Sequence, residues 1–209
     1  MAHPPIPVRC AARPLAGGLV VPWITLIHNG IPAFGAIDAA RRHAAFVHRL
    51  CQICGQQLEE RIYLLVRPMD VHAGYAPEPA VHPECLGYAR QHCPHLNGQA
   101  THYRRTPVSS AHPAGRPCED PNCPCRKTDS SADHAVRAGA PADDWDAWLI
   151  APDSYRLKRA ARDEVLGMDL AVPVLRKRTI RRNDRDHAEL DQALSLLRQL
   201  LDLPGEDGP

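Results

Sequence analysis

The chain has 209 residues, which is enough for one ordinary domain or for two small ones. Its 25 basic and 24 acidic residues leave a net charge of +1, so no global electrostatic field draws it to nucleic acid or to a membrane. Aromatic residues make up only 5% of the chain, so its core has few large side chains and a bound metal would add useful stability.

Residues 1–17 are broken by prolines and arginines, and they predict a flexible arm without the continuous apolar run of a secretory signal. No stretch of the chain reaches the roughly 18 apolar residues that are needed to span a bilayer. We therefore expect a cytoplasmic protein with no membrane partner. Thiols stay reduced in that compartment, so the eight cysteines favour metal binding over disulfides.

A β-hairpin and a helix are predicted next. Residues 20–34 are rich in β-branched and apolar side chains on either side of Asn29-Gly30, a dipeptide that tolerates the positive φ angles of a tight turn. Residues 37–50 then place apolar side chains at intervals of three and four, which is typical of a half-buried helix. Asp38 is suited to cap the N-terminus of this helix.

Beyond this helix, the sequence predicts a short apolar strand and a second helix. The strand covers Ile62–Val66. The helix begins at about Pro83, since proline suits a first turn whose N–H groups have no partner within the helix, and Pro94 ends it. Residues 98–143 show little periodicity and many Gly, Pro, Ser, Thr and Asp residues, which indicates a long irregular loop.

Regular structure is predicted again towards the C-terminus. Residues 148–152 favour a short strand, whereas the pattern of 154–167 fits a strand or a helix. Residues 171–182 alternate between the two faces of an extended chain and predict a strand. Residues 188–203 carry leucines at helical spacing, and this stripe predicts a final helix.

Two pairs of side chains have the spacing of zinc ligands. Cys51 and Cys54 form a Cys-x2-Cys turn, and Gly55 relieves the tight backbone after it. His82 and Cys85 follow at the start of the second predicted helix, where the N-terminus favours an anionic sulfur. Four N and S ligands in two pairs predict one closed tetrahedral zinc site. The alternatives are core thiols beside a surface histidine, or a redox Cys-x2-Cys motif, although no βαβ unit surrounds it.

The order of cysteine turn, strand, loop and ligand-bearing helix matches the treble-clef arrangement of zinc modules. We therefore expect an α+β protein in which the C-terminal segment packs back onto the zinc module. The expected parts are the arm at 1–17, the zinc-binding module at 18–97, the irregular loop at 98–143, a small α/β segment at 144–204 and a tail at 205–209.

A second zinc site is a weaker candidate, and it lies in the irregular loop. Its three thiols belong to Cys118, Cys123 and Cys125, and the fourth ligand would come from His112, His134 or Cys93. The alternatives are free thiols or a loop docked on the first module. Cys93 lies about 12 Å along the helix from Cys85, so we expect it in the core, with His92 and His95 exposed. Cys10 has no evident partner.

Several of these motifs occur together in a known group of proteins. The segments PWITLIHNG, CQICG, RPM, PEPAVHPECLGYA and CPHL, in this order, resemble a family of uncharacterised actinobacterial and actinophage proteins. The resemblance covers about residues 20–96. It implies Cys51, Cys54, His82 and Cys85 as the metal ligands and an intracellular location, and it carries no established activity.

The first functional hypothesis is a non-catalytic zinc module that binds nucleic acid or another protein. The predicted C-terminal strand carries five cations that are suited to phosphate contacts, and residues 155–159 add further basic side chains. The alternative is a solvated strand face that the acidic C-terminal residues balance. The five cations are Arg176, Lys177, Arg178, Arg181 and Arg182.

Two further hypotheses stay open. An HNH-type nuclease needs a histidine base and further His, Asn or Asp ligands for a catalytic metal. Asp70 and His72, Asp133-His134 and Asp186-His187 lack the expected Asn and second His at useful spacing. A pure protein–protein adaptor would use the leucine stripe of the last helix, although such a stripe more often packs against the chain's own sheet.

Overall fold

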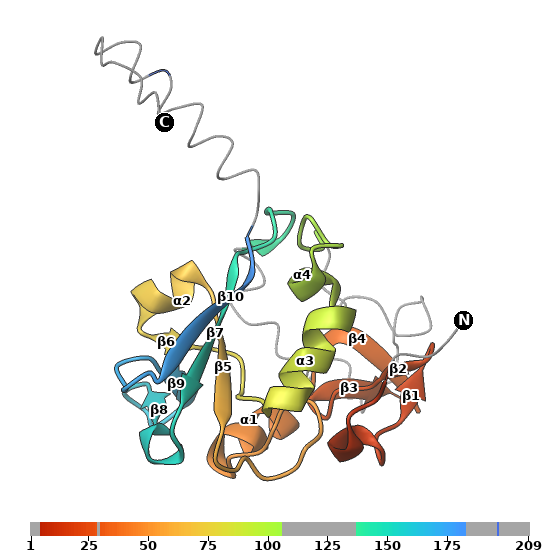
Figure 1. The fold of residues 1–209 in the computed structure, drawn as a ribbon, viewed down its shortest axis with the longest axis horizontal. Helices are drawn as coiled ribbons and strands as arrows, with labels where there is room; N and C mark the ends of the chain where they lie inside the picture. Colours follow the sequence, from red (N-terminus) through yellow and green to blue (C-terminus); the bar gives the residue numbers. More distant parts are fainter. Residues whose placement is uncertain (1–4, 29, 106–136, 183–195, 197–209) are drawn as a thin grey trace, which may run out of the picture.

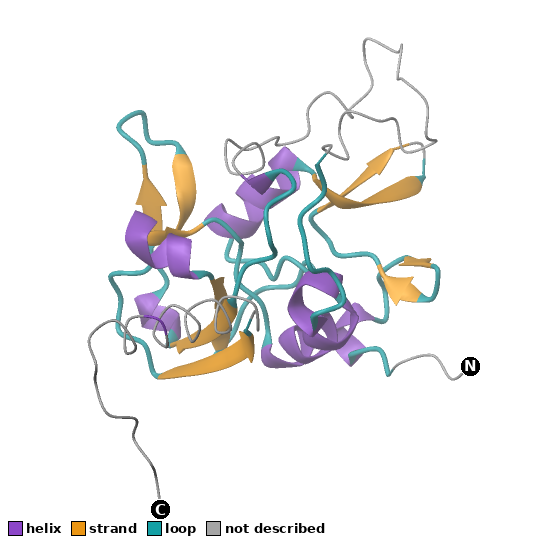
Figure 2. Ribbon diagram, turned by 90° about the horizontal axis from the view of Figure 1, so that it is seen from above, coloured by secondary structure: helices purple, strands orange, loops and turns teal. Residues whose placement is uncertain are grey.

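The computed structural model describes residues 5–28, 30–105, 137–182 and 196, and it confirms an α+β fold. Its strands form four antiparallel sheets of two or three strands each, and no helix in the described ranges is long and apolar enough to cross a membrane. Figure 1 shows helix α3 standing between the sheet that contains β5 and the hairpin β3–β4. In the view from above, helices occupy the middle of the molecule with strands on both sides, and further helical segments lie beside the strands at the left (Figure 2).

The N-terminal half contains β1 (Leu15–Ala16), β2 (Leu19–Val20), β3 (Thr25–His28), β4 (Ile31–Ile37), α1 (Ala39–Val47), β5 (Ile62–Val66), α2 (Pro68–Ala73), β6 (Tyr75–Ala76), α3 (Pro83–His92) and α4 (Pro94–Asn97). The C-terminal half contains β7 (Trp145–Ile150), β8 (Leu157–Arg159), β9 (Val165–Asp169) and β10 (Arg176–Arg181). Short 3-10 turns lie at Val8–Cys10 and Pro152–Ser154.

Local signals account for the first predicted elements. Strands β3 and β4 form the expected hairpin, and Gly30 has a φ of 78° at its turn. The carboxylate of Asp38 caps α1 by accepting a hydrogen bond from the Arg41 N–H at 3.0 Å. Pro83 is the first residue of α3, and the helix ends before Pro94, as expected.

Strand β5 joins the two halves of the chain. All five of its side chains are buried, and it pairs in antiparallel register with β7, so that Leu64 lies opposite Trp148. Strand β10 pairs with the other edge of β7, which gives the sheet order β10-β7-β5. The C-terminal segment therefore packs back onto the first half of the chain, as predicted, and its strand β7 covers one edge of the apolar strand β5.

The N-terminal segment differs from the flexible arm that we expected. Val8–Cys10 form a 3-10 turn, and the Cys10 side chain is 0% exposed within the core. Arg9 forms ion pairs with Glu59, at 2.6 Å, and with Glu84. The prolines shape this segment without preventing it from packing, since a buried thiol and two ion pairs hold it against the rest of the molecule.

The C-terminal half corrects two further details. The ambiguous segment 154–167 contains the last residue of a 3-10 turn, strand β8 and the start of β9. The strand predicted at 171–182 begins only at Arg176, and Val172 lies in the core before it. Of the final predicted helix only Leu196 is described, so that prediction lies outside the described residues.

Candidate metal centre

The first pair of predicted ligands lies in a tight turn after α1. The N–H of Cys51 donates to the Gln56 carbonyl and that of Gly55 to the Cys51 carbonyl, each at 2.8 Å. Gly55 has a φ of 77°, and a Cβ atom there would lie 2.5 Å from the Trp23 ring. Glycine is therefore required both by the backbone conformation and by the close approach of the indole.

The second pair is held at the start of α3. Val81 exchanges two backbone hydrogen bonds with Tyr63 on β5, at 2.9 and 3.0 Å, and this bridge places the next residue, His82, at the N-cap of the helix. Cys85 follows within the first turn of α3. The buried strand β5 thus sets the position of the second pair relative to the first.

The four side chains meet at one point. The ligand atoms of Cys51, Cys54, His82 and Cys85 all lie within 4.8 Å of one another, and we call these residues the Cys3His cluster. Each of the four is between 0% and 6% exposed. Three thiols and an imidazole at this separation fit the tetrahedral shell of a structural zinc ion. The convergence predicted from the Cys-x2-Cys and His-x2-Cys spacing is confirmed.

The orientation of His82 also fits a metal ligand. Its Nε2–H donates to the Gln57 carbonyl at 2.9 Å, which leaves the lone pair on Nδ1. Nδ1 faces the cluster, 3.4 Å from the Cys54 sulfur. A second hydrogen bond that fixes the ring and its tautomer is a common companion of histidine ligation. Nδ1 is therefore the atom of His82 that would bind the ion.

The electrostatics of the cluster call for a cation. Hydrogen bonds from Cys51 and Cys85 hold the pKa of Cys54 far below its usual range, whereas the pKa of Cys85 lies far above it because Cys51 and Cys54 compete for the same charge. Burial opposes protonation of His82, but bonds with Cys51 and Cys54 raise its pKa to about 10 in the metal-free cluster, so an ion that binds Nδ1 would displace a proton. Cys54 thus favours the thiolate form without a metal, and a divalent ion would stabilise further negative charge at the cluster.

A fifth thiol lies beside the cluster, and the sequence did not reveal it. The Cys10 sulfur is 3.9 Å from that of Cys85, although 75 residues separate them. Burial raises the pKa of Cys10, which favours its protonated form, so Cys10 would be the donor if Cys85 were a metal-bound thiolate. Nothing in the spacing near Cys10 indicates this contact, since the two residues meet only in the folded chain.

The other cysteines and histidines fall into two groups. Cys93 is half-buried at the end of α3, beside the apolar cluster of Leu65, Leu96 and Trp145, as expected for a core residue. His92 and His95 are also half-buried, so the expectation that they are exposed was wrong: the chain turns at Cys93 and α4 packs back against the molecule. The three thiols of the second candidate site, Cys118, Cys123 and Cys125, lie outside the described residues.

The five cations that we predicted as polyanion contacts differ in their burial and in their partners. Arg181 is only 8% exposed, and its guanidinium donates to the carbonyls of His95 and Ala100 at 2.9 and 2.8 Å. Arg182 pairs with Asp146 at 3.0 Å. The prediction of Arg181 as a phosphate contact is therefore corrected, because sequence alternation does not show which arginines are buried. Arg182 is exposed, and its prediction as a phosphate contact stays a prediction.

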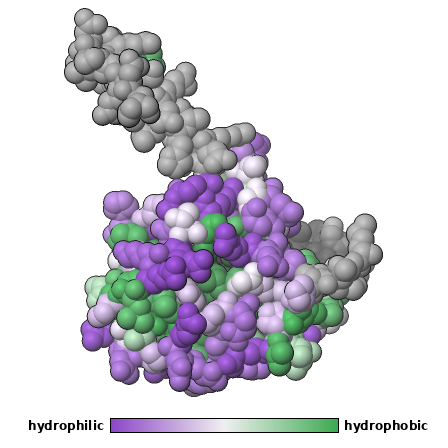
Figure 3. Space-filling model, viewed as in Figure 1, coloured by the Kyte–Doolittle hydropathy of each residue, from purple (hydrophilic) through white to green (hydrophobic). Residues whose placement is uncertain are grey.

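The other three cations lie on an exposed edge. Arg176, Lys177 and Arg178 are exposed on β10, which pairs with β7 and with no other strand among the described residues. The Lys177 ammonium lies 3.8 Å from the centre of the Trp148 ring, a cation–π contact that leaves the charge at the surface. Figure 3 shows mainly hydrophilic residues on the face that β10 crosses.

Asp70, which we considered as a ligand of a catalytic metal, has a structural role. It is 3% exposed and accepts hydrogen bonds from the Arg67 guanidinium at 3.0 and 2.7 Å. It also accepts one from the Arg67 N–H at 2.8 Å, at the start of α2. His72 is exposed on the same short helix. A buried carboxylate that a guanidinium saturates is not available to bind a metal ion.

Comparisons with known proteins give no family assignment. No protein-family model matches the chain, and neither a curated protein nor a solved structure matches it. The functional argument therefore rests on the chain's own residues. Within the described ranges, the Cys3His cluster is the one group of three or more candidate ligands that converges on a point.

Proposed function

We propose that this chain is a non-catalytic binding protein in which one structural zinc ion organises the N-terminal half. The observation that carries the proposal is the convergence of four buried N and S ligands within 4.8 Å. Four protein ligands complete the tetrahedral shell of zinc and leave no position for a substrate or an activated water. We extend the proposal to a cytoplasmic protein related to the actinobacterial and actinophage family, on the basis of the motifs quoted above.

The place of the cluster in the fold supports a structural role. Its ligands come from the turn after α1 and from the first turn of α3, and Cys10 brings the N-terminal segment against it. The chain has few large apolar side chains, so metal coordination stands in for part of a hydrophobic core. A treble-clef arrangement of these elements is part of this proposal.

The binding surface that we propose is the exposed strip of Arg176, Lys177 and Arg178 on β10. Among the described residues, no carboxylate forms an ion pair with any of the three. Cations at a strand edge can neutralise successive phosphates of a nucleic acid, and this type of binding weakens as salt rises. A protein partner with an acidic surface is the alternative.

The test of this surface is salt-dependent binding of a fluorescent single-stranded oligonucleotide. Arg176→Gln combined with Arg178→Gln should weaken binding and reduce the slope of log K against log salt by about 1 for each cation removed. Arg90→Gln, which removes an exposed cation from α3, is the matched control and should change little. If the wild-type protein shows no salt-sensitive binding, the nucleic-acid proposal fails and the protein-partner alternative gains support.

A further inference from the structure

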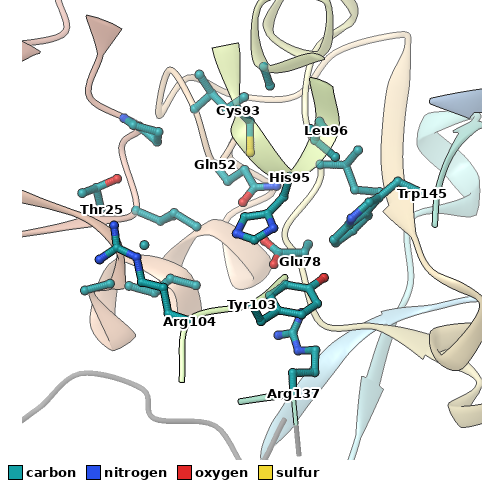
Figure 4. Close-up of a pocket in the computed structure, with 18 residues that line it drawn as sticks. Thr25, Gln52, Glu78, Cys93, His95, Leu96, Tyr103, Arg104, Arg137 and Trp145 are labelled. Atoms are coloured by element: carbon teal, nitrogen blue, oxygen red, sulfur yellow. The ribbon is translucent and has the colours of Figure 1, made fainter. Parts of the chain in front are cut away.

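A cavity of about 350 Å³ lies apart from the metal ligands. It opens between the β3–β4 hairpin, the start of α4 and strand β7, and its walls include Ile24, Leu65 and Leu96, each 5% or 6% exposed. Its volume falls at the lower end of the roughly 300–1,000 Å³ that is typical of small-molecule sites. Figure 4 shows the His95 ring among the side chains that line the cavity, with Glu78 and Tyr103 close to it and Trp145 at one wall.

Two residues that line this cavity each carry a buried nitrogen atom without a hydrogen-bond partner. These atoms are Nε1 of Trp145, a side chain that is 5% exposed, and Nδ1 of His95. An indole N–H can only donate, so it needs an acceptor, and a buried polar group without a partner destabilises the protein. Burial lowers the pKa of His95, and nearby Arg181 adds to this effect, so the ring is neutral at pH 7.

Two charged side chains at the cavity, one acidic and one basic, can bind polar parts of a ligand. Glu78 is half-buried, and its carboxylate has no hydrogen bond or ion pair with any other described residue. A carboxylate accepts hydrogen bonds only, so it calls for donors. Arg104 supplies an exposed cation at the opposite side, near Thr25 (Figure 4). The matching ligand has a flat apolar body, adjacent donors, a nearby acceptor and a negative charge.

We infer that this cavity binds a guanine nucleotide, through its base and one phosphate. Guanine presents N1–H and N2–H side by side for the Glu78 carboxylate, and its O6 would accept from the indole N–H of Trp145 once the side chains that cover this buried nitrogen move aside. The phosphate would face Arg104, and the apolar walls would enclose the base. Reading a base by its Watson–Crick edge in a pocket is an established mode of nucleotide recognition.

The Glu78 carboxylate accounts for the choice of base. Adenine and cytosine each place a ring acceptor next to their single amino group, and uracil flanks its one N–H with two carbonyls. Each of these edges would set a lone pair against the carboxylate, whereas guanine offers two donors. A bidentate pair of this kind discriminates between bases by about 5- to 150-fold.

The test is a calorimetric titration of the full-length protein with GMP, and with AMP, CMP and UMP in parallel. GMP should bind at least about tenfold more tightly than the other three nucleotides. Glu78→Gln should abolish this preference, while Glu60→Gln, which changes an exposed carboxylate in the same way, should keep it. Trp145→Phe should weaken GMP binding with the fold intact, as thermal unfolding would confirm. Equal affinities for the four nucleotides, or unchanged GMP binding by Glu78→Gln, would overturn the inference.

A free nucleotide and an unstacked guanine in a nucleic-acid strand present the same chemistry. A hexanucleotide with one central guanine distinguishes these sources. If it competes with GMP and loses affinity in Glu78→Gln, the cavity reads a base within a strand; if GMP alone binds, the ligand is the free nucleotide. The inference does not depend on β10, because GMP binding should survive Arg176→Gln with Arg178→Gln even if oligonucleotide binding is lost.

Discussion

Two buried polar sites in this molecule differ in how completely their atoms are paired. In the Cys3His cluster, four ligand atoms lie within 4.8 Å of one another, and the remaining nitrogen of His82 bonds to a carbonyl. In the cavity around His95, by contrast, two buried nitrogens and a carboxylate have no partner among the described residues. A metal ion alone would complete the first site. The second site needs a larger molecule that supplies hydrogen-bond partners for several atoms.

The contrast shows how a structural site differs from a recognition site. A closed shell stabilises the protein, so changes there should act on folding. Unpaired donors and acceptors around a cavity weaken the free protein slightly and become favourable only when a ligand supplies their partners. Substitutions in the two sites should therefore separate stability from binding, and the three predictions below test this separation.

The largest effect is expected at the metal centre. Cys54→Ser removes one thiolate, so we expect loss of zinc and unfolding of about residues 45–95, since structural zinc sites contribute on the order of 10 kcal/mol to folding. Metal analysis and far-UV circular dichroism measure the two outcomes. Cys93→Ser is the matched control: it removes a half-buried thiol outside the cluster, so it should retain one zinc and cost roughly 1 kcal/mol. A Cys54→Ser protein with native thermal stability would contradict the structural-zinc assignment.

A smaller effect is expected from the thiol next to the cluster. Cys10→Ala removes the sulfur contact with Cys85 and leaves a small cavity, so we expect a loss of roughly 1–2 kcal/mol with one zinc per chain retained. Zinc release to a chromogenic chelator should also become faster. Urea unfolding and chelator kinetics measure these changes. Loss of the metal from Cys10→Ala would instead make Cys10 a ligand.

The smallest effect is expected from the pH dependence of the cavity. The pKa of His95 is lower in the folded protein than its ordinary value of 6.5, so the unfolded chain takes up a proton first as the pH falls. This residue's contribution to stability is therefore complete above about pH 6.5 and declines below it, by at most about 1.4 kcal/mol per pH unit. His95→Gln should flatten the curve of unfolding free energy between pH 7 and 5.5. Identical slopes for both proteins would show that His95 is not held neutral by burial.

Local chemistry explains which features the sequence predicted well. Asp38 caps α1, and Pro83 begins α3, because each depends on neighbours within one turn. The two ligand pairs of the Cys3His cluster could also be predicted from the sequence. A Cys-x2-Cys turn and a His-x2-Cys pair at the start of a helix are short-range motifs that are typical of metal sites. The treble-clef arrangement and the family resemblance stay predictions.

Features that depend on contacts between distant parts of the chain could not be predicted from the sequence. Cys10 meets Cys85 across 75 residues, and nothing near either residue indicates the contact. Arg181 looks like its neighbours on β10, yet it alone among the predicted cations is buried against carbonyls of His95 and Ala100. The cavity is assembled from segments throughout the chain, so no single motif could reveal its unpaired Trp145 and His95 nitrogens.

The pairing of β5 with β7 has a consequence for the order of events during synthesis. All the residues of the Cys3His cluster leave the ribosome before β7 does, so zinc can be bound while β5 still lacks its sheet partner. In that interval Ile62–Val66 is an apolar strand with an unpaired edge, which is a hazard for aggregation. Early metal binding tethers both ends of this segment, and zinc starvation of the producing cell should therefore lower the yield of soluble protein more than it lowers the stability of protein that has already folded.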